Sequence, residues 1–217
     1  MSRIFWAYAI GLGLSVTLLG APVLSQQAEL SADERFDLAV EAVHAGDYAV
    51  AISGFTALAE TDAPDAQFNL ALLLKTGLGQ PKNYIGAYYW AVLSDLGREH
   101  RAVKMVTELA AFLPVEKRSE VHQRIIKRLS DQLADGNRSA ILKYARIHAE
   151  FLEEPDFETA YIWYSIAQAL AIRGGAQGSA AMVDNMEPAA LIAAQAKAQE
   201  IFLGSPFGQR NAMDPQN

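Results

Sequence analysis

Apolar residues in this chain recur at intervals of three and four, the spacing that keeps side chains on one face of a helix. The stretch 65–97 shows this most clearly, because a helix, a turn with Gly77 and Gly79, and a second helix with Trp90 at its middle follow one another. Neither helix could bury its apolar face alone. The faces consist of Ala66, Leu70 and Ala71 in the first helix, and of Ala87, Trp90 and Ser94 in the second.

The rest of the chain favours helix as well. Ala, Leu, Glu and Gln dominate between the Gly and Pro positions, and no long run alternates between apolar and polar residues. Further helices are expected over 98–112, with Val103 on the apolar face, over 115–133 and over 139–150. The sequence therefore predicts an all-α fold.

An internal repeat organises these helices. Residues 160–163 (Ala-Tyr-Ile-Trp) repeat residues 87–90 (Ala-Tyr-Tyr-Trp) at an offset of 73 (160 minus 87). The predicted organisation is a signal peptide at 1–25, a helix pair at 31–62, a module with an extra helix pair at 65–135, a second module with terminal capping helices at 137–203, and a disordered tail at 204–217.

Two segments resemble known repeat families. The first pair, with Gly-Asp-Tyr at 46–48, resembles a tetratricopeptide unit, and 65–97 resembles a Sel1-like repeat through its two turn glycines, Ala87 and Trp90. It departs from the Sel1 pattern at Ala71, Leu74 and Asp95. The resemblance implies a right-handed α-solenoid of stacked antiparallel helix pairs, whose first helices line the inner surface. It also implies scaffolding of envelope complexes instead of catalysis.

The N-terminus indicates export. A short basic start is followed by an uncharged apolar run over 4–19 and by small residues that suit cleavage near Ser25/Gln26. An uncut anchor in the inner membrane is the alternative, and no later segment could span a membrane. The chain has no cysteine, which is compatible with the periplasm.

Charge and motifs narrow the function further. The formal net charge is −7, although residues 98–146 carry eleven Lys or Arg against six Asp or Glu, so nucleic acid is not expected as a partner. The four histidines, His44, His100, His122 and His148, make no metal-ligand spacing, and no phosphate loop or nucleophile elbow occurs. No catalytic residue, metal site or cofactor is expected.

The resemblance places a partner-binding site on the inner face. Asn, Lys and Arg on such a face could hold a peptide backbone or carboxylate, although Lys143 and Arg146 could equally be ordinary solvated surface. Phe36, Val40 and Glu150 share that face. The predicted partner-binding residues are His44, Phe68, Asn69, Leu72, Lys75, Leu142, Lys143 and Arg146.

The sequence thus predicts a non-catalytic periplasmic repeat adaptor that binds another protein or peptide segment in a cell-wall, secretion, motility or signalling complex. Two rivals stay open. One is a structural oligomer whose repeats bury each other's ends. The other is an accessory subunit of a cell-envelope enzyme, in which His148 or Glu150 would matter.

Overall fold

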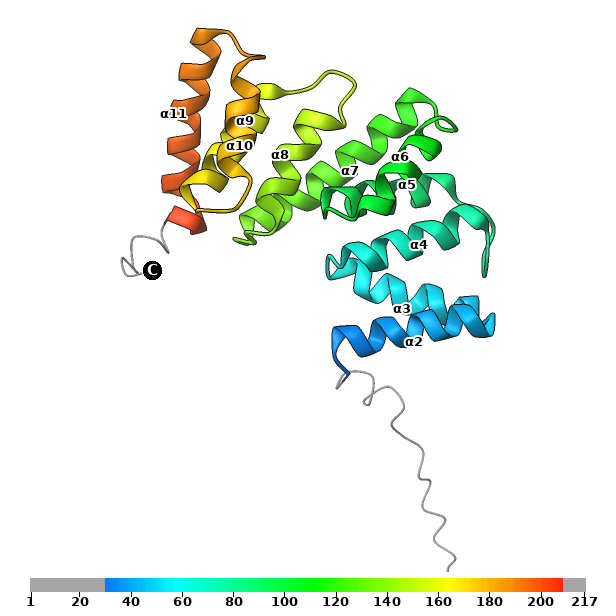
Figure 1. The fold of residues 1–217 in the computed structure, drawn as a ribbon. Helices are drawn as coiled ribbons and strands as arrows, with labels where there is room; N and C mark the ends of the chain where they lie inside the picture. The colour runs from blue at the N-terminus through cyan, green and yellow to red at the C-terminus, as the bar shows by residue number, and fades with distance from the viewer. Residues whose placement is uncertain (1–29, 209–217) are drawn as a thin grey trace, which may run out of the picture. The chain divides into compact units, whose positions relative to one another are not determined.

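A computed structural model describes residues 30–208, and in this range the chain is helical and has no strand (Figure 1). The expected signal peptide at 1–25 and the last part of the expected tail lie outside the described residues. The helices are α2 (Ala32–Ala45), α3 (Tyr48–Glu60), α4 (Pro64–Thr76), α5 (Tyr84–Leu96), α6 (His100–Ala110), α7 (Val115–Ala134), α8 (Ala140–Glu150), α9 (Phe157–Ala169), α10 (Gly175–Val183) and α11 (Pro188–Gly204).

Three helices, α3, α5 and α9, begin in the same way. Each follows an Asp or Asn whose side chain accepts a hydrogen bond from the backbone N–H three residues later. The distance is 2.9 Å for Asn83 and Asp156 and 3.4 Å for Asp47. Before α5, helix α4 ends at Gly77, whose φ of 78° is left-handed.

The same three helices also end alike. The turns after α3, α5 and α9 contain Asp62, Arg98 and Ala171, with φ of 67°, 71° and 54°. This left-handed conformation is unfavourable for residues other than glycine. In each turn the N–H of this residue bonds to the carbonyl three residues back, and the next N–H bonds to the carbonyl five back. Arg98 and Ala171 lie 73 residues apart (171 minus 98), so the offset of the sequence repeat recurs in the backbone.

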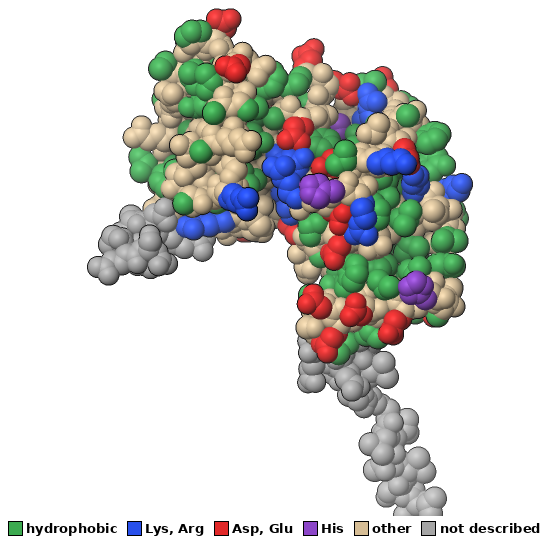
Figure 2. Space-filling view, in the orientation of Figure 1, with side chains coloured by type: hydrophobic (Ala, Val, Ile, Leu, Met, Phe, Trp, Pro, Cys, Tyr) green, Lys and Arg blue, Asp and Glu red, His purple; other side chains and the backbone are tan. Residues whose placement is uncertain are grey.

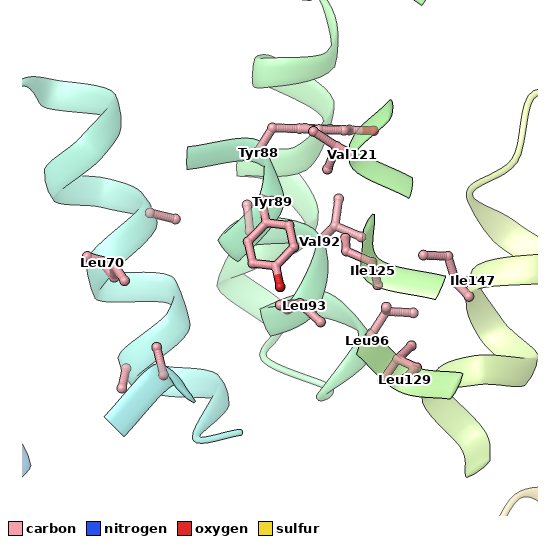
Figure 3. Close-up of a cluster of buried hydrophobic side chains, with 14 of the residues drawn as sticks. Leu70, Tyr88, Tyr89, Val92, Leu93, Leu96, Val121, Ile125, Leu129 and Ile147 are labelled. Atoms are coloured by element: carbon pink, nitrogen blue, oxygen red, sulfur yellow. The ribbon is translucent and has the colours of Figure 1, made fainter. Parts of the chain in front are cut away.

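The Trp-bearing helix α5 lies at the centre of the first module. Helices α4, α6, α7 and α8 all pack on it. Figure 3 shows its side chains, among them Val92, Leu93 and Leu96, between Leu70 of α4 and the α7 residues Ile125 and Leu129. In the same way α9 packs against α8, α10 and α11.

The packing differs from the expected helix pairs in one respect. Helices α2 and α3, α4 and α5, and α8 and α9 pack as hairpins, but α6 and α7 make little contact with each other, and each packs on α5 instead. Helices α10 and α11 repeat this around α9. The fold within the described residues is therefore all-α, and most helices pack on their neighbours in the chain.

Three local expectations need correction. Val103 is 50% exposed, because Ala102, Met105 and Leu109 form the buried face of α6. Trp90 is only half-buried and stands edge-on to the Tyr89 ring with centroids 4.9 Å apart. Phe207, expected in a disordered tail, is 1% exposed and joins the core cluster, since burial of an aromatic ring holds the chain just after α11.

Candidate functional site

The predicted inner-face residues of α4 remain accessible, but α6 partly covers them. The Arg101 guanidinium of α6 lies 4.4 Å from the centre of the Phe68 ring, which is half-buried. Two turns further along both helices, Lys75 forms an ion pair with Glu108. Leu72, which lies between these two contacts along α4, is 39% exposed.

We define the α4–α6 face as Phe68, Asn69, Leu72 and Lys75 of α4 with Arg101, Lys104 and Glu108 of α6. The three α6 residues were not foreseen, although their spacing of three and four already places them on one helix face. The Lys104 side chain is 86% exposed, and its ammonium lies 3.8 Å from the Glu108 carboxylate. Asn69 donates a hydrogen bond to the Asp65 carbonyl at 2.9 Å, so its amide oxygen is the group left to accept from a partner.

The predicted residues of α2 contribute less. His44 is exposed, near the end of the helix. Phe36 and Val40 are half-buried, and the Phe36 ring stands edge-on to Phe55 with centroids 5.5 Å apart. These two side chains pack α2 onto α3, and of the three only His44 is exposed.

Lys143 is not on an accessible surface, contrary to expectation. It is 7% exposed, and its ammonium lies 3.6 Å from the Asp62 carboxylate. The same carboxylate accepts a hydrogen bond from Gln132 at 2.8 Å and lies 3.5 Å from Arg128. Burial lowers the pKa of Lys143, and Asp62 opposes that effect. Lys143 thus joins α8 to the turn between α3 and α4.

Arg146 is also buried, at 5% exposure. Its guanidinium donates to the backbone carbonyl of Asp95 at 2.6 Å, to the Asp95 carboxylate at 3.1 Å, and to Glu150 at 2.7 Å. Burial opposes its charge, but the bonds to Glu150 and Asp95 outweigh burial and raise the pKa. Leu142, on the same helix, is half-buried against the core.

The correction for α8 has a single cause. Helix α8 packs on α5, α7 and α9 at the same time. Lys143 and Arg146, which the sequence pattern predicts on an open face of the helix, are therefore enclosed by neighbouring helices. Lys143 and Arg146 hold helices to each other, and the accessible part of the predicted inner face lies on α4 and on the tip of α2.

Two histidines could have suggested chemistry. His148 is 8% exposed, and its Nδ1 lies 3.3 Å from the Asp156 carboxylate, which also caps α9. His122 is 2% exposed, and its Nε2 is hydrogen-bonded to the Tyr88 hydroxyl at 2.9 Å. Burial lowers the pKa of both histidines and raises the pKa of Tyr88 to about 12. These pairs join helices to each other; both imidazoles are buried, whereas the Asp156 side chain is 40% exposed.

Between residues 30 and 208, no group of His, Asp and Glu is arranged to hold a metal ion. In the same range, no helix combines the length and the apolar character needed to cross a membrane. No protein-family model matches the chain, and no curated protein is similar enough to count as a relative. The candidate site therefore rests on the geometry of the α4–α6 face alone.

Proposed function

We propose that this protein is a non-catalytic adaptor of the Sel1-like and tetratricopeptide type, exported to the periplasm, and that it binds a segment of another envelope protein through the α4–α6 face. The family assignment rests on the repeat, in which the Asn83 and Asp156 caps and the left-handed turns of Arg98 and Ala171 recur at one offset. Such repeats stack into solenoids whose concave side binds extended or helical segments.

One observation carries the choice of face. Leu72, an apolar side chain that is 39% exposed, stands between two contacts that involve charged groups: the Arg101 guanidinium on the Phe68 ring, and the ion pair of Lys75 with Glu108. An apolar contact point bordered by charged groups is the usual composition of a peptide-binding surface, in which the apolar residue gives affinity and the rim gives orientation.

The charges of this face suggest the class of partner. Lys75 pairs with Glu108, and Arg101 pairs with Glu99 at 2.8 Å, whereas the Lys104 side chain is 86% exposed. We therefore expect a client segment with one apolar residue and an acidic neighbour, which Lys104 can meet with a charge-assisted hydrogen bond. Steering by these charges weakens as salt rises.

The test is crosslinking in the native cell envelope, followed by mass-spectrometric identification of what is captured, for the wild type and two variants. Leu72→Asp should lose the captured client, because it puts a charge at the apolar contact point. Val103→Asp is the matched control, since Val103 is an apolar α6 residue, 50% exposed, that does not belong to the α4–α6 face. If both variants retain the same client, the face is wrongly assigned, and if the wild type captures none, the adaptor function fails.

A further inference from the structure

The last long helix, α11, is apolar on two sides, and only one of them is packed. Ala194 and Ala198 are buried on the side that faces α9. On the opposite side runs a row of exposed apolar residues, of which Ile192 and Leu203 are each 64% exposed. We call this row the outer stripe of α11; it consists of Ala189, Ile192, Ala196 and Leu203. One polar but uncharged residue, Gln199, lies at the edge of the row.

The repeat supplies a comparison within the same chain. Helix α7 occupies in the first module the position that α11 occupies in the second. The inner residues match at the offset of 73, since Val121 and Ile125 are buried like Ala194 and Ala198. The outward residues at that offset are different in kind. The α7 residues that correspond to the outer stripe are Glu116, Ser119, Gln123 and Ser130. All four are polar; Ser119 is half-buried and the other three are exposed.

The edge position is the one place where this difference is reversed. Gln199 corresponds to Ile126 of α7, which is half-buried against the core cluster, whereas Gln199 is exposed. At the four stripe positions α7 carries polar residues, and three of them are exposed, so a helix in this place can face water with polar side chains. Covering the apolar stripe of α11 with another surface is favourable, because the transfer of exposed apolar side chains out of water lowers the free energy. On the face drawn in Figure 2, charged side chains are sparse over α10 and α11 and crowded over the middle of the chain.

We propose that the outer stripe of α11 is a self-association surface, on which a second copy of this chain docks its own α11 in antiparallel orientation about a two-fold axis midway between Ala196 and Gln199. The stripe is self-complementary in that arrangement. Leu203 of one copy meets Ile192 of the second, and the symmetry repeats this contact on the other side of the axis. Ala196, beside the axis, meets Gln199 of the second copy, and its small side chain allows close helix packing.

Charge also favours a second copy. Lys197 and Glu200 are the only charged residues of α11, and they pair with each other at 2.9 Å on the same helix. Two copies of a chain with a formal net charge of −7 repel each other over most of their surface. They can approach through the stripe because its own residues carry no charge, so no unpaired charge has to lose water.

The size of the surface sets the expected strength. Helix α11 has 17 residues and so spans about 25 Å. It offers eleven exposed residues, whereas a stable interface uses about 20–30 a side. The dimer should therefore be weak, with a Kd on the order of tens of micromolar. This proposal does not depend on the α4–α6 face.

The first test is sedimentation equilibrium of the full chain from about 5 to 200 µM, a range that brackets the expected Kd. The wild type should change from mainly monomer to mainly dimer. A triple variant, Ile192→Ser, Ala196→Gln and Leu203→Ser, copies the polar residues that α7 carries at these positions, and it should remain monomeric with an unchanged circular dichroism spectrum. A monomeric wild type at 200 µM, or an unaffected dimer in the folded triple variant, overturns the proposal.

A matched control places three polar substitutions at exposed apolar residues away from α11: Val50→Gln, Val103→Ser and Phe112→Ser. These side chains are 50–64% exposed, so the change in surface polarity is similar. The control variant should dimerise like the wild type. Loss of its dimer would show that general surface hydrophobicity, and not the stripe, causes association, and would overturn the assignment.

Because the chain has no cysteine, a single added thiol reports the geometry directly. Ala196→Cys, beside the two-fold axis, should form an interchain disulfide under mild oxidation, since paired Cα atoms must lie within roughly 7 Å. Lys104→Cys, which lies away from the stripe at a side chain that is 86% exposed, should not. Equal crosslinking of the two variants refutes the docking geometry. So does a dimer that appears only after deletion of residues 209–217, because the chain's own end would then be the occupant.

Discussion

Replacing Arg146 by Ala is the sharpest test of the corrected role of α8. The guanidinium is the hydrogen-bond partner of the Asp95 carbonyl and carboxylate, and the Arg146 side chain is 7% exposed against 14% for Asp95. Removing one member of a buried ion pair costs about 3–5 kcal/mol, because the remaining charge stays buried without a partner. The bond to Glu150 adds little, since that side chain is 43% exposed and lies one helical turn away.

We therefore expect Arg146→Ala to lower the free energy of unfolding by about 3 kcal/mol, at the low end of that range. For a domain of this size, each kcal/mol shifts Tm by about 2–4 °C, so the loss should be roughly 6–12 °C. Urea unfolding followed by circular dichroism at 222 nm measures the free energy. Arg146→Lys should lose about half as much, because lysine keeps the charge but not the two-pronged geometry.

Arg124→Ala is the matched control, since Arg124 is an exposed arginine of α7 whose guanidinium lies 4.8 Å from the centre of the Tyr89 ring. Its loss should cost at most about 1 kcal/mol. A cost for Arg146→Ala that does not exceed the cost for Arg124→Ala would refute the structural role. Reversing the charge of Arg146 would face Asp95 and Glu150 with a third carboxylate, so a loss of partner binding in that variant could not be separated from unfolding.

Three further predictions concern the caps, the buried histidine and the chain end. Asn83→Ala and Asp156→Ala should each cost about 1 kcal/mol in urea unfolding, and Asp47→Ala less, because its cap bond is 3.4 Å long instead of 2.9 Å; equal costs would contradict the geometry. Burial lowers the pKa of His122, so the unfolded chain takes up a proton first and stability should fall as pH drops below about 6.5; His122→Leu should flatten this slope between pH 7 and 5, and an unchanged slope would show that other groups cause it. Phe207→Ala should lower the free energy of unfolding by about 3 kcal/mol, since a 1% exposed ring leaves a cavity, whereas a neutral result would mean that residues after α11 are not part of the core.

Local sequence patterns were sufficient for much of this fold. The capping residues Asn83 and Asp156, the left-handed Gly77, and the apolar spacing of Ala66, Leu70 and Ala71 all act through bonds and contacts within a few residues. Because these interactions do not depend on distant parts of the chain, the helical class and the position of most turns could be predicted from them.

The candidate site could be predicted only in part, because it depends on which helices cover which faces. Phe68, Asn69, Leu72 and Lys75 all lie in α4, at a spacing that keeps them on one side of the helix, but their neighbour across that side, α6, is 25 or more residues further along the chain. Its residues Arg101 and Glu108 meet Phe68 and Lys75 only after folding. No local pattern in the sequence states that two such helices lie side by side.

The amino-acid sequence by itself determined the helices, their caps and the 73-residue repeat, since each follows from short-range chemistry. Only the tertiary structure decided the fate of the charged and apolar residues on those helices. Lys143 and Arg146 look like surface residues in sequence, yet they are enclosed because α8 packs on three neighbours at once. Ile192 and Leu203 look like core residues, yet they are exposed because α11 is the last long helix and the described chain places no further helix over its outer side.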